Sequence, residues 1–192
     1  MDVVFVSGRP SLDLVGTLKW RRRGDGAQEQ LTAPSVLGEW AVRSGLADEM
    51  LPVTAVELAE ALDLREALYR TVRARLGRRN LDTADVELLN SYAGRRPVTP
   101  ELSPDGRVRK CASASELLSS VTRDLLELLG GSEIAHVREC SRAECTRLYV
   151  DTSRGRNRRW CGMTECGNRA KVEAFRQRQK PDAADVSGRE IQ

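Results

Sequence analysis

Apolar residues recur every three or four positions along the first two thirds of the chain, which is the spacing of one buried face of an α-helix. The longest such segment begins at Thr54, which has the sequence pattern of a capping box with Glu57, and it stops at Gly77. Ser113 and Glu116 repeat that pattern before a leucine-rich run that ends at a pair of glycines. These signals predict two long helices that form a core.

Shorter elements are predicted around these two helices. One helix has Pro34 in its first turn, and another is capped by Asp82. Residues 97–110 carry a turn signal between two partly alternating arms, which predicts a small hairpin. Residues 3–6 and 134–139 are expected to be short strands. The predicted fold class is therefore mainly α (α+β), with a helical N-terminal domain that includes a small β-hairpin.

Four of the five cysteines follow as two pairs, Cys140 with Cys145 and Cys161 with Cys166. Each pair encloses four residues and fifteen residues separate the pairs, a spacing that predicts a tetrahedral zinc site with a small hairpin in the link between the pairs. Two disulfides or four unrelated thiols are the alternatives. Because four thiolates leave no open coordination position, we expect one structural Zn²⁺ rather than a catalytic ion.

Positive charge is concentrated around the second cysteine pair. Residues 154–180 hold nine basic and two acidic residues, a net charge of +7, whereas the whole chain carries +3 and the remainder therefore −4. This asymmetry is typical of a nucleic-acid contact, and part of it can also balance the charge of a thiolate-bound metal. The candidate DNA-binding residues are Arg154, Arg156, Arg158, Arg159, Arg169, Lys171, Arg176 and Arg178.

A basic helix is predicted directly after the second pair, with Asn168 as its N-cap. Val172 and Phe175 form a narrow apolar stripe that is expected to pack on the zinc hairpin. Arg169 is interpreted either as a buried arginine that ties this helix to a carbonyl beside the metal or as a DNA contact. Trp160 is interpreted as an aromatic lid over the metal, with base stacking as the alternative. The C-terminal module thus combines a four-cysteine zinc site with a basic helix.

Two stretches of the chain resemble known families. The run WCGMTECGNRAKVEAFRQR resembles the CGNR zinc finger, and the match extends back through Cys140, Cys145 and the run LYVDTSRGR. This resemblance implies a DNA-binding zinc module of bacterial transcription regulators. The opening SGRPSLDLVGTL, with LTAPSVLGEWAVRSGL and LREALYRTV further on, resembles the ABATE domain that commonly precedes this finger. Gly16 stands where that family usually has Asn, so a ligand pocket that used the Asn would differ here.

The favoured hypothesis is a zinc-dependent, DNA-binding transcription regulator that responds to stress or to a ligand. In this hypothesis residues 1–130 sense a small-molecule effector or form a homodimer, residues 134–180 bind double-stranded DNA, and residues 181–192 are a disordered tail. The alternatives are a zinc-stapled small-molecule-binding or protein-interaction module that binds no DNA, and a thiol redox switch. RNA is an alternative to DNA as the nucleic acid.

No enzyme is predicted, because the sequence shows no Ser-His-Asp or Cys-His combination and no Gly-rich phosphate loop. The single histidine, His136, is expected to be a surface or packing residue rather than a ligand. No apolar run approaches the roughly 18 residues of a membrane span. The odd number of cysteines and a start without a secretory signal predict a cytoplasmic protein with reduced thiols. The fifth cysteine, Cys111, is expected to be buried.

Overall fold

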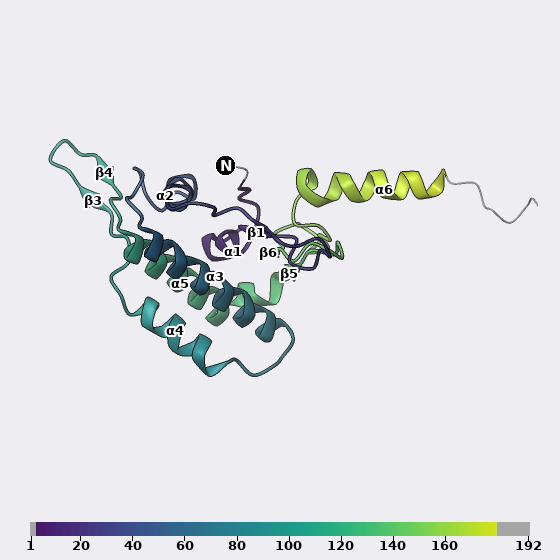
Figure 1. Cartoon of the computed structure of the whole chain (residues 1–192), viewed down its shortest axis with the longest axis horizontal. Helices are drawn as coiled ribbons and strands as arrows, with labels where there is room; N and C mark the ends of the chain where they lie inside the picture. The colour runs from purple at the N-terminus through teal and green to yellow at the C-terminus, as the bar shows by residue number, and fades with distance from the viewer. Residues whose placement is uncertain (1–2, 180–192) are drawn as a thin grey trace, which may run out of the picture.

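The computed structural model of the chain describes residues 3–179 and contains six α-helices and three two-stranded antiparallel sheets in that range (Figure 1). The predicted disordered tail at residues 181–192 lies outside the described residues. Of the described residues, 49% are helical and 8% lie in strands, which confirms the mainly α fold class. The helices are α1 (Pro10–Val15), α2 (Pro34–Arg43), α3 (Ala55–Leu76), α4 (Thr83–Ala93), α5 (Ala114–Gly130) and α6 (Asn168–Arg178).

Helices α3 and α5 form the centre of the apolar core, where α1 and α4 pack against both of them and α2 packs against α3 (Figure 1). Both predicted capping boxes are present. The Thr54 hydroxyl accepts from the Glu57 backbone amide at 3.2 Å, and Ser113 and Glu116 form the same arrangement in α5. Each cap contributes about 1 kcal/mol to helix stability. Trp40 of α2 is fully buried, and so are these leucines of the two central helices: Leu64, Leu68, Leu117, Leu118, Leu125 and Leu128.

The predicted hairpin within residues 97–110 is also confirmed. Strand β3 (Glu101–Leu102) pairs with β4 (Val108–Arg109), and the amide of Gly106 closes the turn by donating to the carbonyl of Ser103 at 2.9 Å. Figure 1 shows that this hairpin and α6 lie at opposite ends of the molecule.

The prediction of a strand at residues 3–6 is wrong, because the polar groups of this segment pair with a side chain instead of a neighbouring strand. The backbone amides of Val6 and Ser7 both donate to the carboxylate of Asp13 in α1, at 3.1 and 3.0 Å. A hairpin that the sequence pattern did not predict follows α1, with β1 (Leu18–Lys19) paired to β2 (Gln28–Glu29).

The prediction of a strand at residues 134–139 holds only for its second half. Ser132–His136 is a 3-10 helix, and only β5 (Val137–Glu139) is extended, paired antiparallel with β6 (Leu148–Val150). Val137, Leu148 and Val150 are at most 3% exposed and belong to the same apolar core as the helices. The β5–β6 sheet of the C-terminal segment therefore shares its core with the N-terminal helices.

A buried arginine strengthens this junction. Arg147, which is 5% exposed, donates to the carbonyls of Val4 at 2.9 Å and Gly16 at 3.1 Å, and it lies 3.9 Å from the carboxylate of Asp13. A Cβ atom built on Gly16 would lie 2.5 Å from Nη1 of Arg147. The missing side chain at position 16, where the ABATE pattern has Asn, therefore makes room for the guanidinium of Arg147.

We expect Gly16 and Arg147 to depend on each other energetically. Arg147→Ala leaves two carbonyls and a buried carboxylate without their partner and should cost about 3–5 kcal/mol of unfolding free energy. Gly16→Asn should cost about 1–3 kcal/mol through overpacking. Because Arg147→Ala removes the group that clashes, the double variant should be more stable than the sum of the two losses implies. Denaturant unfolding of the four zinc-loaded proteins measures this, and additive losses would contradict the coupling.

Candidate metal centre and basic helix

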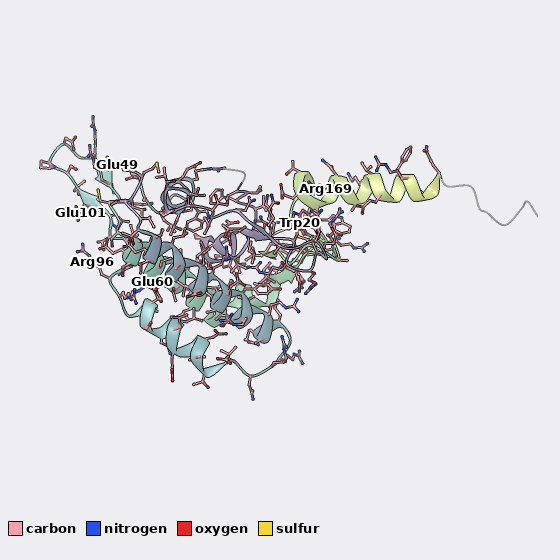
Figure 2. The ribbon with its side chains drawn as sticks, viewed as in Figure 1. Trp20, Glu49, Glu60, Arg96, Glu101 and Arg169 are labelled. Carbon is pink, nitrogen blue, oxygen red and sulfur yellow. The ribbon has the colours of Figure 1, made fainter. Side chains whose placement is uncertain are left out.

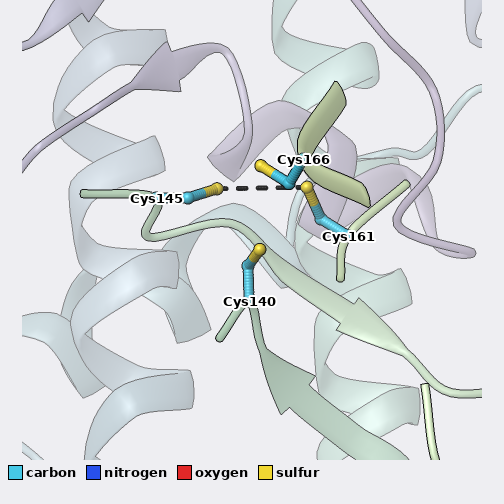
Figure 3. Close-up of side chains that lie close together, drawn as sticks. All are labelled: Cys140, Cys145, Cys161 and Cys166. Carbon is cyan, nitrogen blue, oxygen red and sulfur yellow. Dashed lines mark hydrogen bonds between the residues drawn. The ribbon is translucent and has the colours of Figure 1, made fainter. Parts of the chain in front are cut away.

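The four paired cysteines converge on one point inside the protein (Figure 3). All four are buried free thiols, and their sulfur atoms lie within 4.8 Å of one another. The Sγ atoms of Cys145 and Cys161 are 3.9 Å apart. Zinc–sulfur bonds of about 2.3 Å place the sulfurs of a tetrahedral site about 3.8 Å apart, which matches this separation. Four converging sulfurs do not fit two separate disulfides. The cysteines are positioned to bind one zinc ion, as predicted.

The first cysteine pair lies at the tip of the β5–β6 hairpin. The amide of Cys140 donates to the carbonyl of Arg147 at 3.0 Å, and the amide of Cys145 donates to the carbonyl of Arg142 at 3.0 Å. The prediction of a hairpin in the link at 146–160 is therefore wrong. The paired strands flank the first cysteine pair, and the part of the link beyond β6 has no further strand.

In the second pair, Cys166 lies within a tight helical turn, Met163–Gly167, that leads into α6, and Cys161 lies two residues before this turn. The amides of Cys166 and Gly167 both donate to the carbonyl of Gly162, at 3.1 and 2.9 Å. A Cβ atom on Gly167 would lie 2.7 Å from the sulfur of Met163, so a side chain at this position would displace the half-exposed Met163 side chain. The prediction of Asn168 as the N-cap of the basic helix is wrong, because Asn168 has helical dihedral angles (φ −66°, ψ −39°) and the chain runs from the turn into α6 without a break.

The electrostatics of the cluster favour a cation. Hydrogen bonds from the three neighbouring thiols, together with the backbone amide of Arg142, lower the pKa of Cys140 well below its usual range. The neighbouring thiols of Cys140, Cys145 and Cys166 raise the pKa of Cys161. The four groups therefore cannot all ionise on their own at this distance, and a divalent ion removes the conflict because it stabilises every thiolate. Two guanidinium nitrogens of Arg142, Nε and Nη1, are buried without a hydrogen-bond partner in the described structure.

Aromatic side chains pack around the cysteines. Tyr149 and Trp20 are buried in the same cluster, and Trp160 packs against it, as expected of a lid. Burial raises the pKa of Tyr149 to about 12, so its neutral hydroxyl donates to the carbonyl of Arg158 at 2.6 Å. Neither Trp20 nor Tyr149 was predicted to belong to this site.

Trp20 brings the N-terminal segment to the metal centre. Its backbone has φ +58°, a left-handed conformation that is uncommon for a bulky residue. The guanidinium carbons of Arg142 and Arg169 lie 5.8 and 5.4 Å from the centre of its ring, and Figure 2 shows Arg169 beside Trp20 at the start of α6. No sequence signal could have found Trp20, because it lies in a loop far from the cysteines along the chain.

Three of the arginines predicted as DNA contacts have structural partners. Arg158 donates to the carbonyls of Trp160 at 2.7 Å and Val6 at 3.2 Å, and to that of Cys161. Arg169 is exposed against Trp20, so the interpretation of a buried arginine is wrong. Arg156 is exposed and hydrogen-bonds to the ring of His136.

The remaining candidates are open to solvent. His136 lies outside the cysteine cluster, as expected. Arg159 is exposed, with its guanidinium carbon 5.4 Å from the centre of the Trp160 ring. Among residues 154–179, the exposed cations for which the described structure gives no ion pair are Arg154, Arg156, Arg159, Arg169, Lys171, Arg176 and Arg178.

The expected packing of α6 on the zinc hairpin is wrong. Val172 and Phe175 are 47% and 54% exposed. The helix instead turns its opposite side to the metal centre, where Glu173 accepts from Arg142 at 2.8 Å and Ala170 lies near Trp160 in one surface hollow. In this orientation of the helix, Glu173 forms its ion pair with Arg142 while Val172 and Phe175 remain on the outside.

Comparisons with known proteins identify both parts of the chain. The model of the ABATE family, described as "Putative stress-induced transcription regulator", matches residues 8–132. The chain belongs to the ABATE family. The CGNR zinc finger matches residues 136–179, which follow directly. Both resemblances seen in the sequence are thereby confirmed. A search of curated proteins found no match.

These ABATE and CGNR matches describe a zinc-binding, regulator-like protein, and both families are of regulator or zinc-finger type rather than enzyme families. None of the described helices has the length and apolar content needed to cross a membrane. Cys111 is exposed, contrary to expectation, because it lies in the loop between β4 and α5 and outside the core.

We expect the purified, reduced protein to contain one zinc ion per chain. Cys161→Ser should remove most of this zinc and lower the melting temperature, since zinc binding contributes on the order of 10 kcal/mol to such sites. Elemental analysis and thermal unfolding measure the two effects. Cys111→Ser is the matched control, because it removes an exposed thiol outside the cluster and should leave zinc content unchanged. Full zinc content in Cys161→Ser would contradict the site.

Proposed function

We propose that the protein is a zinc-dependent transcription regulator that binds double-stranded DNA through its C-terminal finger. The observation that carries this proposal is the display of exposed cations on an element fixed by the buried cysteine cluster. Phosphate contacts need such cations, and a rigid support lowers the entropy lost on binding. The net charge of +7 on residues 154–180 supports nucleic acid as the partner.

The exposed cations divide into two groups. Arg154, Arg156 and Arg159 belong to the loop before the second cysteine pair, whereas Lys171, Arg176 and Arg178 belong to α6. We include these six residues as proposed phosphate contacts. Arg169 is a further candidate because it is exposed, although it also contacts Trp20. Arg158 is left out because carbonyl oxygens occupy its guanidinium.

In this proposal, residues 1–130 are the sensing part and residues 134–180 the DNA-binding part. The boundary between the two family matches, after residue 132, supports the division. The ABATE description as a stress-induced regulator supports a role in gene control. A small-molecule effector and a homodimer stay predictions.

The alternatives account for less of what is seen. A purely structural zinc staple explains the cysteine cluster and its aromatic neighbours. It leaves unexplained why Lys171, Arg176 and Arg178 are exposed on the parts of α6 that do not face the metal centre. A thiol redox switch would need an oxidant to reach the four cysteine sulfurs. Each of these cysteines is at most 7% exposed.

We expect the protein to bind duplex DNA with an affinity that falls steeply as the salt concentration rises. Arg176→Ala/Arg178→Ala should weaken binding and reduce the slope of log K against log salt by about 2, since each lost phosphate contact removes roughly one unit. Fluorescence anisotropy at several salt concentrations measures both quantities.

The control for this experiment removes two charges at the other end of the molecule. Arg107 and Arg109 are exposed residues of the β3–β4 hairpin, which lies opposite α6 (Figure 1). Arg107→Ala/Arg109→Ala changes net charge by the same amount and should leave the affinity and the slope nearly unchanged. An equal loss in both double variants would mean that net charge, not the finger, governs binding. Full DNA affinity in Arg176→Ala/Arg178→Ala would remove α6 from the interface.

A further inference from the structure

The exposed side of α6 has an ordered arrangement of apolar and basic side chains. Val172, Phe175 and Gln179 are spaced three and four residues apart, so they form one row along the helix. With about 100° between successive residues, Lys171 and Arg178 lie along one side of this row and Arg176 along the other. We call these six residues the outer face of α6: Lys171, Val172, Phe175, Arg176, Arg178 and Gln179.

The outer face is free of the rest of the described chain. The six residues line one shallow surface hollow, and no other described residue contributes to it. All six are exposed, and none is acidic. The one acidic residue of α6, Glu173, lies on the opposite side in an ion pair with Arg142. In Figure 1, α6 extends away from the helical domain.

We propose that the outer face of α6 enters the major groove of DNA and reads thymine through its 5-methyl group, with Val172 and Phe175 as the contact residues. This inference rests on the proposed function, since it assumes that the finger binds duplex DNA. It adds which face is inserted and which base is recognised. The flanking Lys171, Arg176 and Arg178 contact the phosphates on the two sides of the groove.

Charge and dimensions support this partner. A single α-helix fits the major groove, and phosphates line both edges of that groove, so cations are needed on both sides of the inserted row. The outer face has this pattern, with an uncharged row between basic flanks. Cations alone would provide affinity without sequence preference.

The chemistry of the row indicates the base. The thymine methyl is the apolar group that base pairs display in the major groove, and apolar side chains contact it. Val172 and Phe175, which are half exposed in the free protein, would bury apolar surface there. Gln179 at the end of the row carries an amide, which can pair with adenine N6 and N7. The outer face therefore carries groups that contact A·T pairs, and it has no Asp or Glu side chain to accept a hydrogen bond from N4 of cytosine.

The test compares two pools of short random-sequence DNA duplexes. One pool contains thymine, and in the other every thymine is replaced by uracil, which lacks the 5-methyl group. The zinc-loaded full chain should bind the thymine pool about fourfold more tightly for each methyl group buried. Val172→Ala/Phe175→Ala should bind both pools equally and at the affinity of the uracil pool. Competition anisotropy at moderate salt measures the ratio of the two affinities.

A matched variant separates this effect from a general loss of apolar surface. Leu102 is 74% exposed on the β3–β4 hairpin, so Leu102→Ala should keep the preference for thymine. Zinc content and circular dichroism check that every variant is folded. Because Val172 and Phe175 are exposed, their loss should leave the fold intact.

The outcomes distinguish the two proposals. No binding to either pool would overturn the proposed function and this inference together. Binding with equal affinity for the two pools would overturn the inference and leave DNA binding standing. A Phe175-dependent dimer in sedimentation, or Phe175-dependent binding to anionic vesicles, combined with no thymine preference, would assign the outer face to a second copy or to a lipid surface and overturn the inference as well.

Discussion

Sulfur atoms buried within 4.8 Å of one another impose the condition that the rest of the C-terminal segment meets. Four thiolates at this distance repel strongly and need a divalent cation, and the two residue pairs that provide them lie on different elements. The ion therefore joins the tip of the β5–β6 hairpin to the turn at Met163–Gly167. Since α6 continues directly from that turn, the direction of the helix depends on metal coordination.

The N-terminal part of the protein completes this centre. Trp20 packs against the cysteines, and Arg147, which lies between Cys145 and β6, donates to the carbonyls of Val4 and Gly16. These contacts are buried, so they are stronger than the same contacts would be at the surface. The finger is thus braced on two sides, by the metal and by the ABATE segment that begins the chain.

The sequence was sufficient for features that depend on local chemistry. The capping boxes at Thr54 and Ser113 fixed the starts of α3 and α5, and the short cysteine spacings indicated the zinc ligands. These signals are readable because each involves residues within a few positions of one another. The mainly α class followed from the helical periodicity between them.

Features that depend on contacts across the chain were not predictable. The placement of Trp20 at the metal and of Arg147 beside Gly16 joins residues more than a hundred positions apart. The rotation of α6 was predicted wrongly because its apolar stripe is the usual sign of a buried face. The side that faces the metal centre carries Ala170 and Glu173, which pairs with Arg142, and spacing alone does not reveal such a contact.

The shared core of β5–β6 and the helices limits how the finger can be exchanged between proteins. Val137, Leu148 and Val150 are buried against helices of the N-terminal part. A finger grafted onto an unrelated domain would expose these side chains to water. The new domain would need an apolar surface of complementary shape to bury them. Inheritance of the two parts as one block, rather than free shuffling, is the arrangement that this packing favours.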